Sequence, residues 1–468
     1  MSYSIEHNIL DPNLYVKHQG LPHELYDLWR EQDPVHWNPP TSDYEAPGSD
    51  SSMSKGFYVL TRYQDVFDAS RNPELYTPHD EGNLIWDYEG AGLERVKANF
   101  MCMLPKDHAE VKQVITPPFS PKPMMEMAPK IDEIAREIVD EVAGKGSCEF
   151  VFDVAAKLPV FTFCELMGIP NEHRERVVEL GNALADVEAQ KQLDFNPGVE
   201  LTTLALELGE EKRKNPDGLL FSTIVNDAKL NLDPLQIAMF FQVFAVAGHE
   251  TTRSTASHFI HLMNQNPDQY ALLREDFDGR IDNAIEEVLR YTSTTTHFRR
   301  TTTADTEIGG VKVEKGAKIY MSYGSANRDP EVFENPHKFD ILRKNARKHL
   351  AFGTGPHVCT GARLARLQLK ALLRQVVTRI PDITVKEATW LPSIWFNAII
   401  HMPVEFTQEQ ILEFMKCKED PVYFANNYVK IISLDEGLTQ FHPYHFQEKL
   451  INNFHNNRFN ICKMPRQT

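Results

Sequence analysis

The sequence predicts a mainly α fold with a few small β-sheets. Long segments carry helical periodicity or apolar runs bounded by Pro, Gly or Asp, whereas the strand-like stretches are short and local. The strands do not alternate with helices in a βαβ rhythm, so a dinucleotide-binding sheet is not expected. With 468 residues and 42% hydrophobic content, the chain can bury a large core. The expected helices span 122–145, 158–168, 200–214, 232–266, 282–291 and 360–379, and the expected strands span 56–61, 306–313 and 318–323.

The helix over 232–266 has the clearest boundaries. Asp233 and Pro234 form a good N-cap and first-turn pair, and Asn266 with Pro267 marks the end. The helix over 360–379 begins directly behind a glycine-rich turn. In the strand region over 306–313, the pair Gly309-Gly310 predicts a turn between two short strands.

Composition excludes several classes of protein. The formal net charge of −17 argues against nucleic acid as a partner of the main body. The 6 cysteines show no paired spacing, which suits a reducing compartment. The first residues are polar and interrupted by Pro and Gly, with no apolar run for a signal peptide or membrane span. We therefore expect a soluble, cytoplasmic protein that does not contact a membrane.

The segment Phe352–Gly361, FGTGPHVCTG, is the most informative part of the chain. Cys359 lies on a turn made flexible by Gly353, Gly355 and Gly361, directly before a helix-forming run. A sulfur at a helix N-terminus is favoured as a thiolate, because free backbone N–H groups and the positive end of the dipole face it. Such a thiolate is a suitable axial ligand for a haem iron. The alternative is a buried, inert cysteine behind a glycine-rich loop.

This segment resembles the haem-binding loop of the cytochromes P-450, F-G-x-G-x-H-x-C-x-G, at every fixed position. The resemblance extends over residues 1–406 and implies the cytochrome P-450 fold, a large helical domain around a buried haem b. It implies that Cys359 ligates the iron and that Phe352 contacts the cofactor. The implied activity is that of a monooxygenase, which inserts one oxygen atom from O2 into a C–H bond.

A second matching segment, Ala247–Thr252, lies inside the helix expected over 232–266. By the same resemblance, Gly248 leaves room for dioxygen, Thr251 donates a hydrogen bond to it, and Glu250 helps to bring protons. A proton relay in an apolar helix requires a hydroxyl and a carboxylate of this kind. The alternative is an ordinary threonine pair beside a solvated glutamate.

The family's E-x-x-R pair corresponds to Glu287 and Arg290, at helical i,i+3 spacing. Phe339 and Arg343 resemble the segment whose arginine completes that ion network. The implied role is structural: the network supports the core behind the haem.

Four further cations resemble contacts to the haem propionates. His357 belongs to the cysteine loop, Arg300 precedes Asp305 by five residues, and His108 with Lys112 matches a pattern H-x-x-x-R. Here the usual arginine is Lys112, which can pair with a carboxylate but lacks the bidentate fork. Each of these side chains, taken singly, is compatible with an ordinary surface cation.

The substrate is implied only as a class. The closest family resemblance is to bacterial members that hydroxylate steroid side chains and acyclic terpenes, so we expect a lipophilic small molecule. A non-catalytic haem sensor or redox protein is the alternative, but a sensor has no need of Glu250 and Thr251. The candidate wall residues of the substrate pocket are Leu84, Ile85, Trp86, Ala247, Thr294, Thr295 and Trp395.

No flavin or iron–sulfur motif accompanies the haem segment, so electrons are expected from NAD(P)H through an external ferredoxin or flavodoxin. A basic cluster near the cysteine loop is a candidate docking face for such an acidic partner, although it is equally compatible with a solvated surface. We expect the protein to be a monomer. The cluster comprises Arg343, Lys344, Arg347, Lys348, Arg363, Arg366 and Lys370.

The composition changes after residue 406. Residues 407–468 balance acidic against basic side chains and are rich in aromatics and Asn-Asn pairs. This tail resembles the opening of the large terminase subunit of tailed bacteriophages, truncated at Pro465–Thr468 before the lysine of a phosphate loop, so it cannot hydrolyse ATP. The sequence favours a viral fusion, in which case the protein would work in the host cytoplasm. A genuine accessory module, or a DNA-packaging fusion without ATPase activity, remains the alternative.

Overall fold

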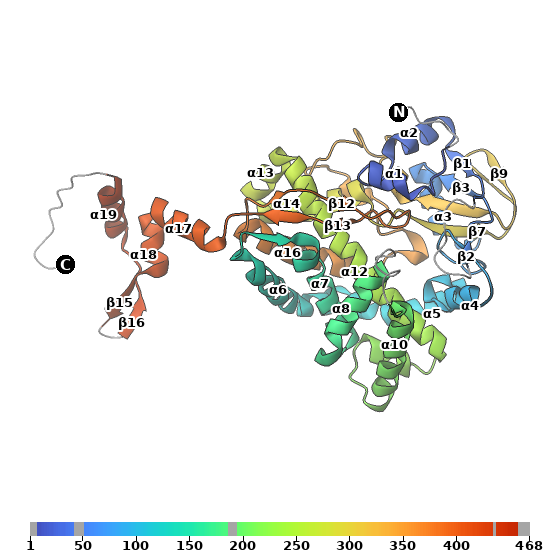
Figure 1. Ribbon diagram of the computed structural model, residues 1–468, viewed down its shortest axis with the longest axis horizontal. Coiled ribbons are helices and arrows are strands. Elements are labelled where there is room, and N and C mark those ends of the chain that lie inside the picture. Colours follow the sequence, from blue (N-terminus) through green and yellow to red (C-terminus); the bar gives the residue numbers. More distant parts are fainter. Residues whose placement is uncertain (1–6, 42–50, 186–193, 434–436, 457–468) are drawn as a thin grey trace, which may run out of the picture.

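The computed structural model describes residues 7–41, 51–185, 194–433 and 437–456 (Figure 1). Helices make up most of the main body, so the mainly α prediction is confirmed. No helix in these ranges is both long and apolar enough to cross a bilayer. In chain order the helices of the body are α1 Pro12–Lys17, α2 His23–Gln32, α3 Tyr63–Arg71, α4 Gly90–Ala98, α5 Pro105–Ile115, α6 Pro121–Ala143, α7 Lys157–Met167, α8 Asn171–Ala185, α10 Pro197–Lys214, α11 Leu220–Asn226, α12 Pro234–Gln265, α13 Pro267–Glu275, α14 Phe277–Thr292, α15 Tyr323–Ala326 and α16 Ala362–Arg379.

Helix α12 runs through the centre of the body and carries much of the core (Figure 1). Its start matches the sequence prediction, because the Asp233 carboxylate accepts the Gln236 backbone N–H at 2.8 Å while the Gln236 side chain accepts the Asp233 N–H. This reciprocal capping satisfies two backbone donors that would otherwise lack partners. The helix ends at Gln265, directly before Asn266 and Pro267.

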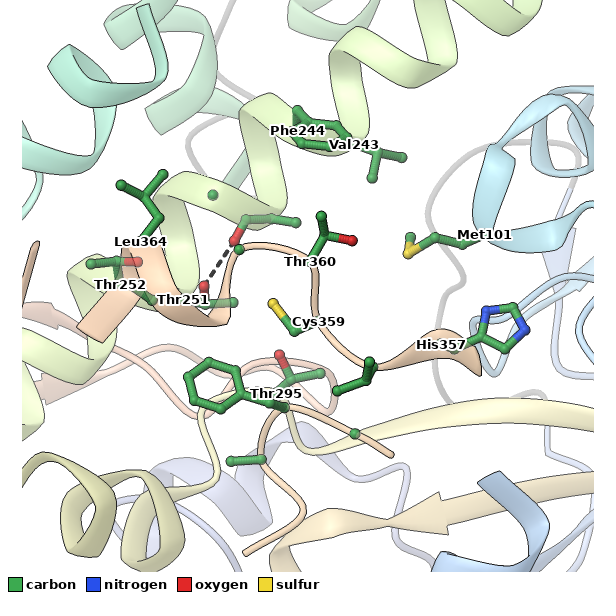
Figure 2. Close-up of a pocket in the computed structure, with 18 of the residues that line it drawn as sticks. Met101, Val243, Phe244, Thr251, Thr252, Thr295, His357, Cys359, Thr360 and Leu364 are labelled. Atoms are coloured by element: carbon green, nitrogen blue, oxygen red, sulfur yellow. Dashed lines mark hydrogen bonds between the residues drawn. The ribbon is translucent and has the colours of Figure 1, made fainter. Parts of the chain in front are cut away.

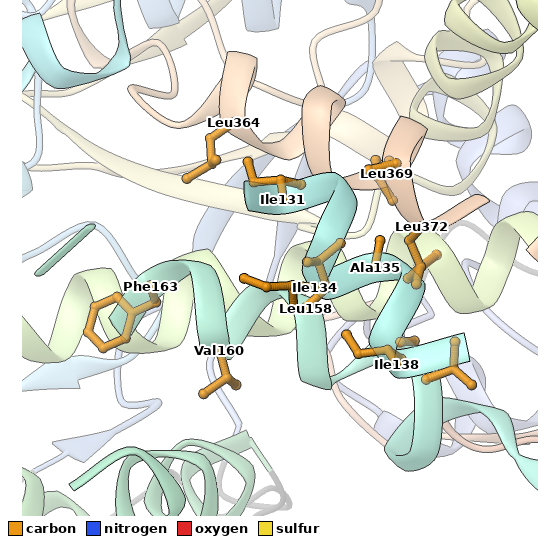
Figure 3. Packing of buried hydrophobic residues seen from close by; sticks show 14 of the residues in the cluster. Ile131, Ile134, Ala135, Ile138, Leu158, Val160, Phe163, Leu364, Leu369 and Leu372 are labelled. Carbon is orange, nitrogen blue, oxygen red and sulfur yellow. The ribbon is translucent and has the colours of Figure 1, made fainter. Parts of the chain in front are cut away.

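Helices α6, α7 and α16 pack together beside α12, and α16 directly follows the cysteine loop. Figure 3 shows apolar side chains of the three helices facing one another. On α6 these side chains recur at i, i+3, i+4 and i+7, the spacing of a single buried face. The labelled residues are Ile131, Ile134, Ala135 and Ile138 on α6, Leu158, Val160 and Phe163 on α7, and Leu364, Leu369 and Leu372 on α16.

The largest sheet has the strand order β1–β3–β10–β7–β4. Its pairs are antiparallel except β3 with β10, which is parallel. Successive side chains of β7 point to opposite faces, so Arg299 and Arg300 serve different surroundings. The strands of this sheet are β1 Val35–Asn38, β3 Phe57–Leu60, β10 Lys318–Ser322, β7 His297–Thr302 and β4 Tyr76–Thr77.

The remaining sheets of the body are small. The predicted turn at Gly309-Gly310 joins β8 and β9, and both glycines have positive φ, of 55° and 86°. A residue with a side chain rarely adopts two such values in succession, which explains the glycine pair. The small sheets contain β2 Ser51–Ser52 with β5 Asp87–Tyr88, β8 Thr306–Ile308 with β9 Val311–Val313, β12 Thr389–Trp390 with β13 Ile399–His401, and β11 Thr384–Val385 with β14 Pro403–Glu405 and β6 Ser147–Glu149.

The tail after residue 406 lies apart from the helices of the body (Figure 1). Large apolar side chains, among them Phe414 at 69% and Tyr444 at 72%, are exposed on it, which agrees with the expectation that the tail cannot bury its own aromatics. Phe459 and the predicted end of the terminase resemblance, 465–468, lie outside the described residues. The tail contains α17 Glu409–Glu419, α18 Pro421–Tyr428, the hairpin β15 Lys430–Ser433 with β16 Gly437–Gln440, and α19 His445–Asn456.

The tail contacts the body through a few surface groups. Arg379, at the end of α16, binds the Glu409 carboxylate at 2.7 and 2.6 Å and also binds Asp140 at 2.7 Å. Thr407 donates to the Asp382 carboxylate. Since Arg379 would keep Asp140 when Glu409 is removed, we expect the body to depend little on the tail.

Deletion of residues 407–468 should therefore leave the melting temperature of the body unchanged and raise its solubility, because exposed aromatics are removed. Thermal melting and light scattering check this. A truncation that keeps α17, and with it Glu409, is the matched control for the Arg379 contact. A fall of several degrees, roughly the effect of losing about 1–2 kcal/mol, would instead identify the tail as a stabilising module.

Candidate active site

A large cavity lies between α12, α5, β7 and the loop that precedes α16 (Figure 2). The space in it that no atom occupies, its opening to solvent included, is about 1640 Å³. Apolar side chains form most of its wall. Polar groups enter the wall at a few points only: the cysteine loop, the threonines of α12, and a group of cations at one end.

The cysteine loop brings the Cys359 thiol to the cavity (Figure 2). Gly353 and Gly355 have φ values of 66° and 71°, which side chains rarely adopt. A Cβ on Gly355 would also lie 2.7 Å from the backbone oxygen of Ser70, so only glycine fits there. The Cys359 N–H donates to the Phe352 carbonyl at 2.9 Å and closes the loop.

The start of α16 lies directly beside the thiol. Cys359 is exposed, but only toward the cavity, and removal from bulk water raises the pKa of its thiol above the ordinary value. The backbone N–H groups of Gly361 and Ala362 and the cations Lys112 and Arg366 lower it. The helix start thus favours the thiolate, as the sequence predicts, but removal from bulk water has the larger effect.

Lys112 holds the cysteine loop. Its Nζ donates to the Val358 carbonyl at 2.9 Å and to the Thr360 hydroxyl at 2.7 Å. Burial lowers the pKa of this ammonium. The side chain lines the cavity, as expected for a contact to an anionic ligand, yet two of its three donors already bind the protein.

Three more cationic or potentially cationic side chains gather at the same end of the cavity. The rings of His108 and His357 stack with centroids 4.1 Å apart, and Arg300 lies beside them, buried. Burial, then neighbouring cations, lowers the pKa of His108 to about 4 and that of His357 to about 2. The described lining of the cavity contains no Asp or Glu to balance these groups.

This lining suits a haem. A flat apolar macrocycle requires apolar walls, its iron a thiolate, and its propionates a cationic end without competing carboxylates. All three are present in one cavity, in which the Cys359 thiol supplies the sulfur. The Arg300 guanidinium donates through Nη1 to the Arg299 carbonyl at 2.7 Å and, among the described residues, retains further donors for a carboxylate.

One face of α12 forms a wall of the cavity. At Gly248 a Cβ would meet no atom within 4 Å, so the helix presents a bare surface to open space. The Thr251 hydroxyl donates to the Ala247 carbonyl at 2.8 Å (Figure 2), and Thr252 lines the cavity next to it. Val243 and Phe244, about two turns before Thr251, line the same cavity. Their helical spacing from Thr251 could have identified them from the sequence.

Glu250 does not share that face. Its carboxylate is fully buried, lies 2.6 Å from Nη2 of Arg253, and accepts the Ser254 hydroxyl at 3.0 Å. It is absent from the cavity lining. The structure therefore places Thr251 in the cavity and Glu250 behind it.

The expected substrate walls are only partly found. Ala247, Thr294 and Thr295 line the cavity, but Leu84, Ile85, Trp86 and Trp395 do not. Ile85 is buried in a separate apolar cluster that Trp86 packs against, and the Trp395 ring contacts the Phe396 ring in a tilted arrangement, with centroids 4.3 Å apart. From that segment it is Asn83 that reaches the lining. Other lining residues that sequence reasoning missed are Phe100, Met101, Phe119, Phe163 and Phe298.

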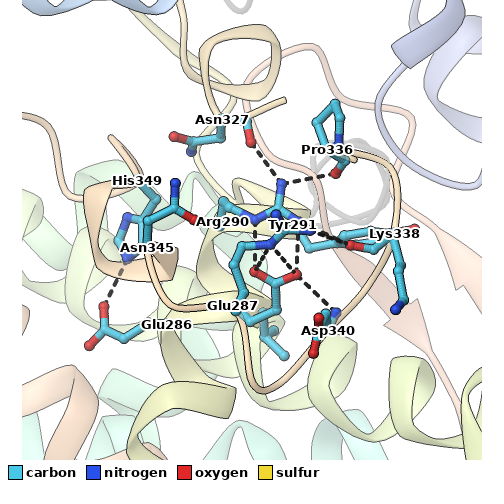
Figure 4. A network of polar contacts seen from close by, with 12 residues as sticks. Glu286, Glu287, Arg290, Tyr291, Asn327, Pro336, Lys338, Asp340, Asn345 and His349 are labelled. Carbon is cyan, nitrogen blue, oxygen red and sulfur yellow. Dashed lines mark hydrogen bonds and ion pairs between the residues drawn. The ribbon is translucent and has the colours of Figure 1, made fainter. Parts of the chain in front are cut away.

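A buried ion network connects α14 to the long loop that follows α15 (Figure 4). Arg290 binds both oxygens of Glu287, at 2.7 and 2.8 Å, and neither side chain is exposed. Nε of Arg343 lies 3.1 Å from both oxygens of the same carboxylate. The three residues singled out in the sequence are thus brought into one network.

Comparison with known proteins gives a consistent result. A family model described as cytochrome P450 matches residues 157–380. The steroid C26-monooxygenase of Rhodococcus jostii (strain RHA1) is 31% identical over 406 residues, which cover 85% of this chain and 84% of that protein. The linalool 8-monooxygenase of Pseudomonas putida is 32% identical over 388 residues, covering 80% of this chain and 92% of the relative.

A solved structure agrees with these sequence relatives. A Mycobacterium marinum cytochrome P450 in complex with pseudoionone superposes with a TM-score of 0.77 and 32% identity. The match covers 87% of this chain and 99% of the other.

Proposed function

The chain belongs to the cytochrome P450 family and is a haem-dependent monooxygenase; from this premise we propose that Cys359 is the axial ligand of the haem iron. The observation that carries the proposal is the position of the Cys359 thiol, which faces the same cavity as the bare Gly248 surface and Thr251. Haem with such a ligand activates O2 and inserts one oxygen atom into an unactivated C–H bond.

The chain's own residues would hold the cofactor at both ends. Arg300, His357 and His108 would bind its propionates, and Phe352 would pack beside it. Both histidines have a low pKa, and the described cavity lining holds no carboxylate. They would therefore bind the propionates as neutral N–H donors, or take up a proton when the propionates enter the cavity. Lys112 would contribute less, because it already binds Val358 and Thr360.

Thr251 and Glu250 are proposed to deliver protons to the reacting oxygen. The Thr251 hydroxyl has one proton, which it donates to the Ala247 carbonyl, so it would have to turn away from that carbonyl to donate to the reacting oxygen. Its lone pairs would then accept a hydrogen bond from the next proton donor. Glu250 has to leave Arg253 to reach it, because the carboxylate lies outside the cavity lining.

The double variant Thr251→Ala/Thr252→Ala should divert electrons to hydrogen peroxide while haem content and substrate-induced spectra stay intact, because binding does not need the hydroxyls. Both threonines are changed because Thr252 also lines the cavity. Peroxide and product per NAD(P)H oxidised are measured. Thr378→Ala is the control, since its hydroxyl also donates to the carbonyl four residues earlier, at 2.7 Å, but at an exposed position of α16 that does not line the cavity. Unchanged coupling in the double variant would contradict the assignment.

We propose a lipophilic substrate, with a steroid side chain or a terpenoid as the first classes to test. The apolar wall of the cavity supports this, and the relatives include a steroid C26-monooxygenase and a linalool 8-monooxygenase. Difference spectra of the holoprotein with sterols, terpenes and fatty acids would rank these classes.

Electrons are proposed to come from NAD(P)H through a separate ferredoxin or flavodoxin. Of the basic cluster expected to form its docking face, Lys344, Arg347 and Lys348 are exposed. Arg343 does not belong to that face, because it is buried and binds Glu287. The other three cations of the cluster already have partners in the protein. Arg366 pairs with Glu286, Lys370 pairs with Asp282, and Arg363 donates to the Phe119 carbonyl. We therefore place the docking face around residues 344–348.

The tail after residue 406 is proposed to take no part in this chemistry, since the cavity lining contains none of its residues. The resemblance of the tail to a truncated terminase and its viral origin stay predictions. The cytoplasmic localisation of the protein also stays a prediction.

A further inference from the structure

Glu286 precedes the glutamate of the E-x-x-R pair and has a different set of partners. Its carboxylate, 1% exposed, accepts hydrogen bonds from Nε and Nη2 of Arg366 at 2.6 and 2.9 Å. It also lies 2.9 Å from Nε2 of the His349 ring (Figure 4). His349 lies before the cysteine loop and Arg366 lies after it. One buried carboxylate thus connects both ends of the loop that carries Cys359.

The hydrogen bonds assign the charges in this cluster. Nδ1 of His349 accepts the Ala351 N–H at 3.1 Å, so the proton of the neutral ring is on Nε2, which donates to Glu286. Burial lowers the pKa of His349, in keeping with a neutral ring. The full charge of Glu286 is therefore balanced mainly by Arg366, since Arg347 lies 3.9 Å away and is 71% exposed.

Arg366 also contacts the loop itself. Its guanidinium carbon lies 4.5 Å from the centroid of the Phe352 ring, and Phe352 accepts the Cys359 N–H and lines the cavity. Arg366 is therefore coupled by packing to the residue that closes the loop on Cys359.

We propose that Glu286 and Arg366 are a positioning pair that sets electron donation by the Cys359 sulfur and, through it, the reduction potential of the bound haem. The inference rests on the proposed function, in which Cys359 ligates the iron. One-electron reduction by the external donor adds a negative charge at the haem, and a nearby cation stabilises that charge while a nearby anion opposes it. The two residues should therefore act in opposite directions.

The test is the reduction potential of the holoprotein, measured by spectroscopic titration with dithionite and mediators. Arg366→Gln should shift the potential to more negative values, Glu286→Gln should shift it to more positive values, and the double variant should return close to the unmodified protein. Glu286→Gln keeps an oxygen that accepts the His349 N–H. Arg366→Lys, which keeps the charge, should restore most of the shift caused by Arg366→Gln.

Arg374→Gln is the matched control. This variant removes the same charge from the same helix. Arg374 lies about 12 Å further along the axis of α16 than Arg366 and pairs with Asp278 at an exposed position. The reduction potential should therefore not change. Shifts of equal sign for Arg366→Gln and Glu286→Gln, or no shift with full haem content, would overturn the proposal and indicate a structural role. The proposed function fails separately, if the unmodified protein lacks the thiolate-type carbon monoxide spectrum.

Discussion

Replacing Cys359 by serine is expected to abolish the spectrum of a thiolate-ligated haem. The ferrous carbon monoxide complex of the unmodified protein should absorb at the red-shifted Soret position that a thiolate donor produces, because sulfur pushes electron density onto the iron. A serine hydroxyl is a far weaker donor and does not ionise near neutral pH. Product formation should therefore fall below detection together with the band. Carbon monoxide difference spectra of the two proteins, at matched haem content, measure this.

Cys102→Ser is the matched control for this prediction. Cys102 is fully buried, and burial raises its pKa to about 12, so it is a thiol that cannot readily become a ligand. The red-shifted band should persist in that variant. A histidine-type band in the unmodified protein would refute the assignment of Cys359, whatever the serine variant shows.

The parts of the fold that the sequence predicts well are those with strong local signals. Helix α12 is found between the residues that mark its ends, since Asp233 and Gln236 cap it and Asn266 with Pro267 stops it. The longer helices α6 and α16 were likewise found close to their predicted ranges. Short helices such as α3 and α4 were missed, because nine residues hold too little periodicity and depend on packing for their stability.

The residues of the candidate site also differ in how strongly the local sequence specifies them. Cys359, Gly353 and Gly355 are specified locally, because the loop closes on its own backbone and its glycines adopt positive φ. The partners of Lys112 were not predictable, because a long flexible side chain can reach many oxygen atoms. In the structure its partners are two oxygens of the cysteine loop. The wall residues depend on which way a loop faces, and a register difference of one residue brought Asn83 rather than Leu84 to the cavity.

The spacing of Glu250 and Arg253 in the sequence is compatible with a buried ion pair. Glu250 and Arg253 repeat the spacing of Glu287 and Arg290, and both pairs form buried ion pairs on one helix face. The spacing alone does not distinguish a relay from a structural pair; the surroundings of each pair do. In the described structure, Nε of Arg253 has no hydrogen-bond partner, whereas Nε and Nη1 of Arg290 both donate hydrogen bonds.

The buried network around Arg290 takes the place of regular secondary structure in the long loop that leads toward the cysteine. Arg290 donates to the carbonyls of Asn327 and Pro336, at 2.9 and 3.0 Å, and Arg343 donates to those of Glu334 and Lys338, at 2.6 and 2.9 Å. Buried carbonyls in a loop require such donors, because no strand or helix supplies them.

Arg290→Leu should therefore destabilise the protein strongly. It leaves the Glu287 carboxylate buried with Arg343 as its remaining cation and removes the donors of two loop carbonyls, and loss of one partner of a buried pair costs about 3–5 kcal/mol. Chemical denaturation of the holoprotein measures the loss, and Arg290→Lys should recover only part of it, because an ammonium lacks the planar fork. Lys130→Gln breaks a pair of the same i,i+3 spacing on the surface and should change nothing measurable. If Arg290→Leu proved as stable as Lys130→Gln, the network would not be what holds the loop, and apolar packing around it would have to carry that role.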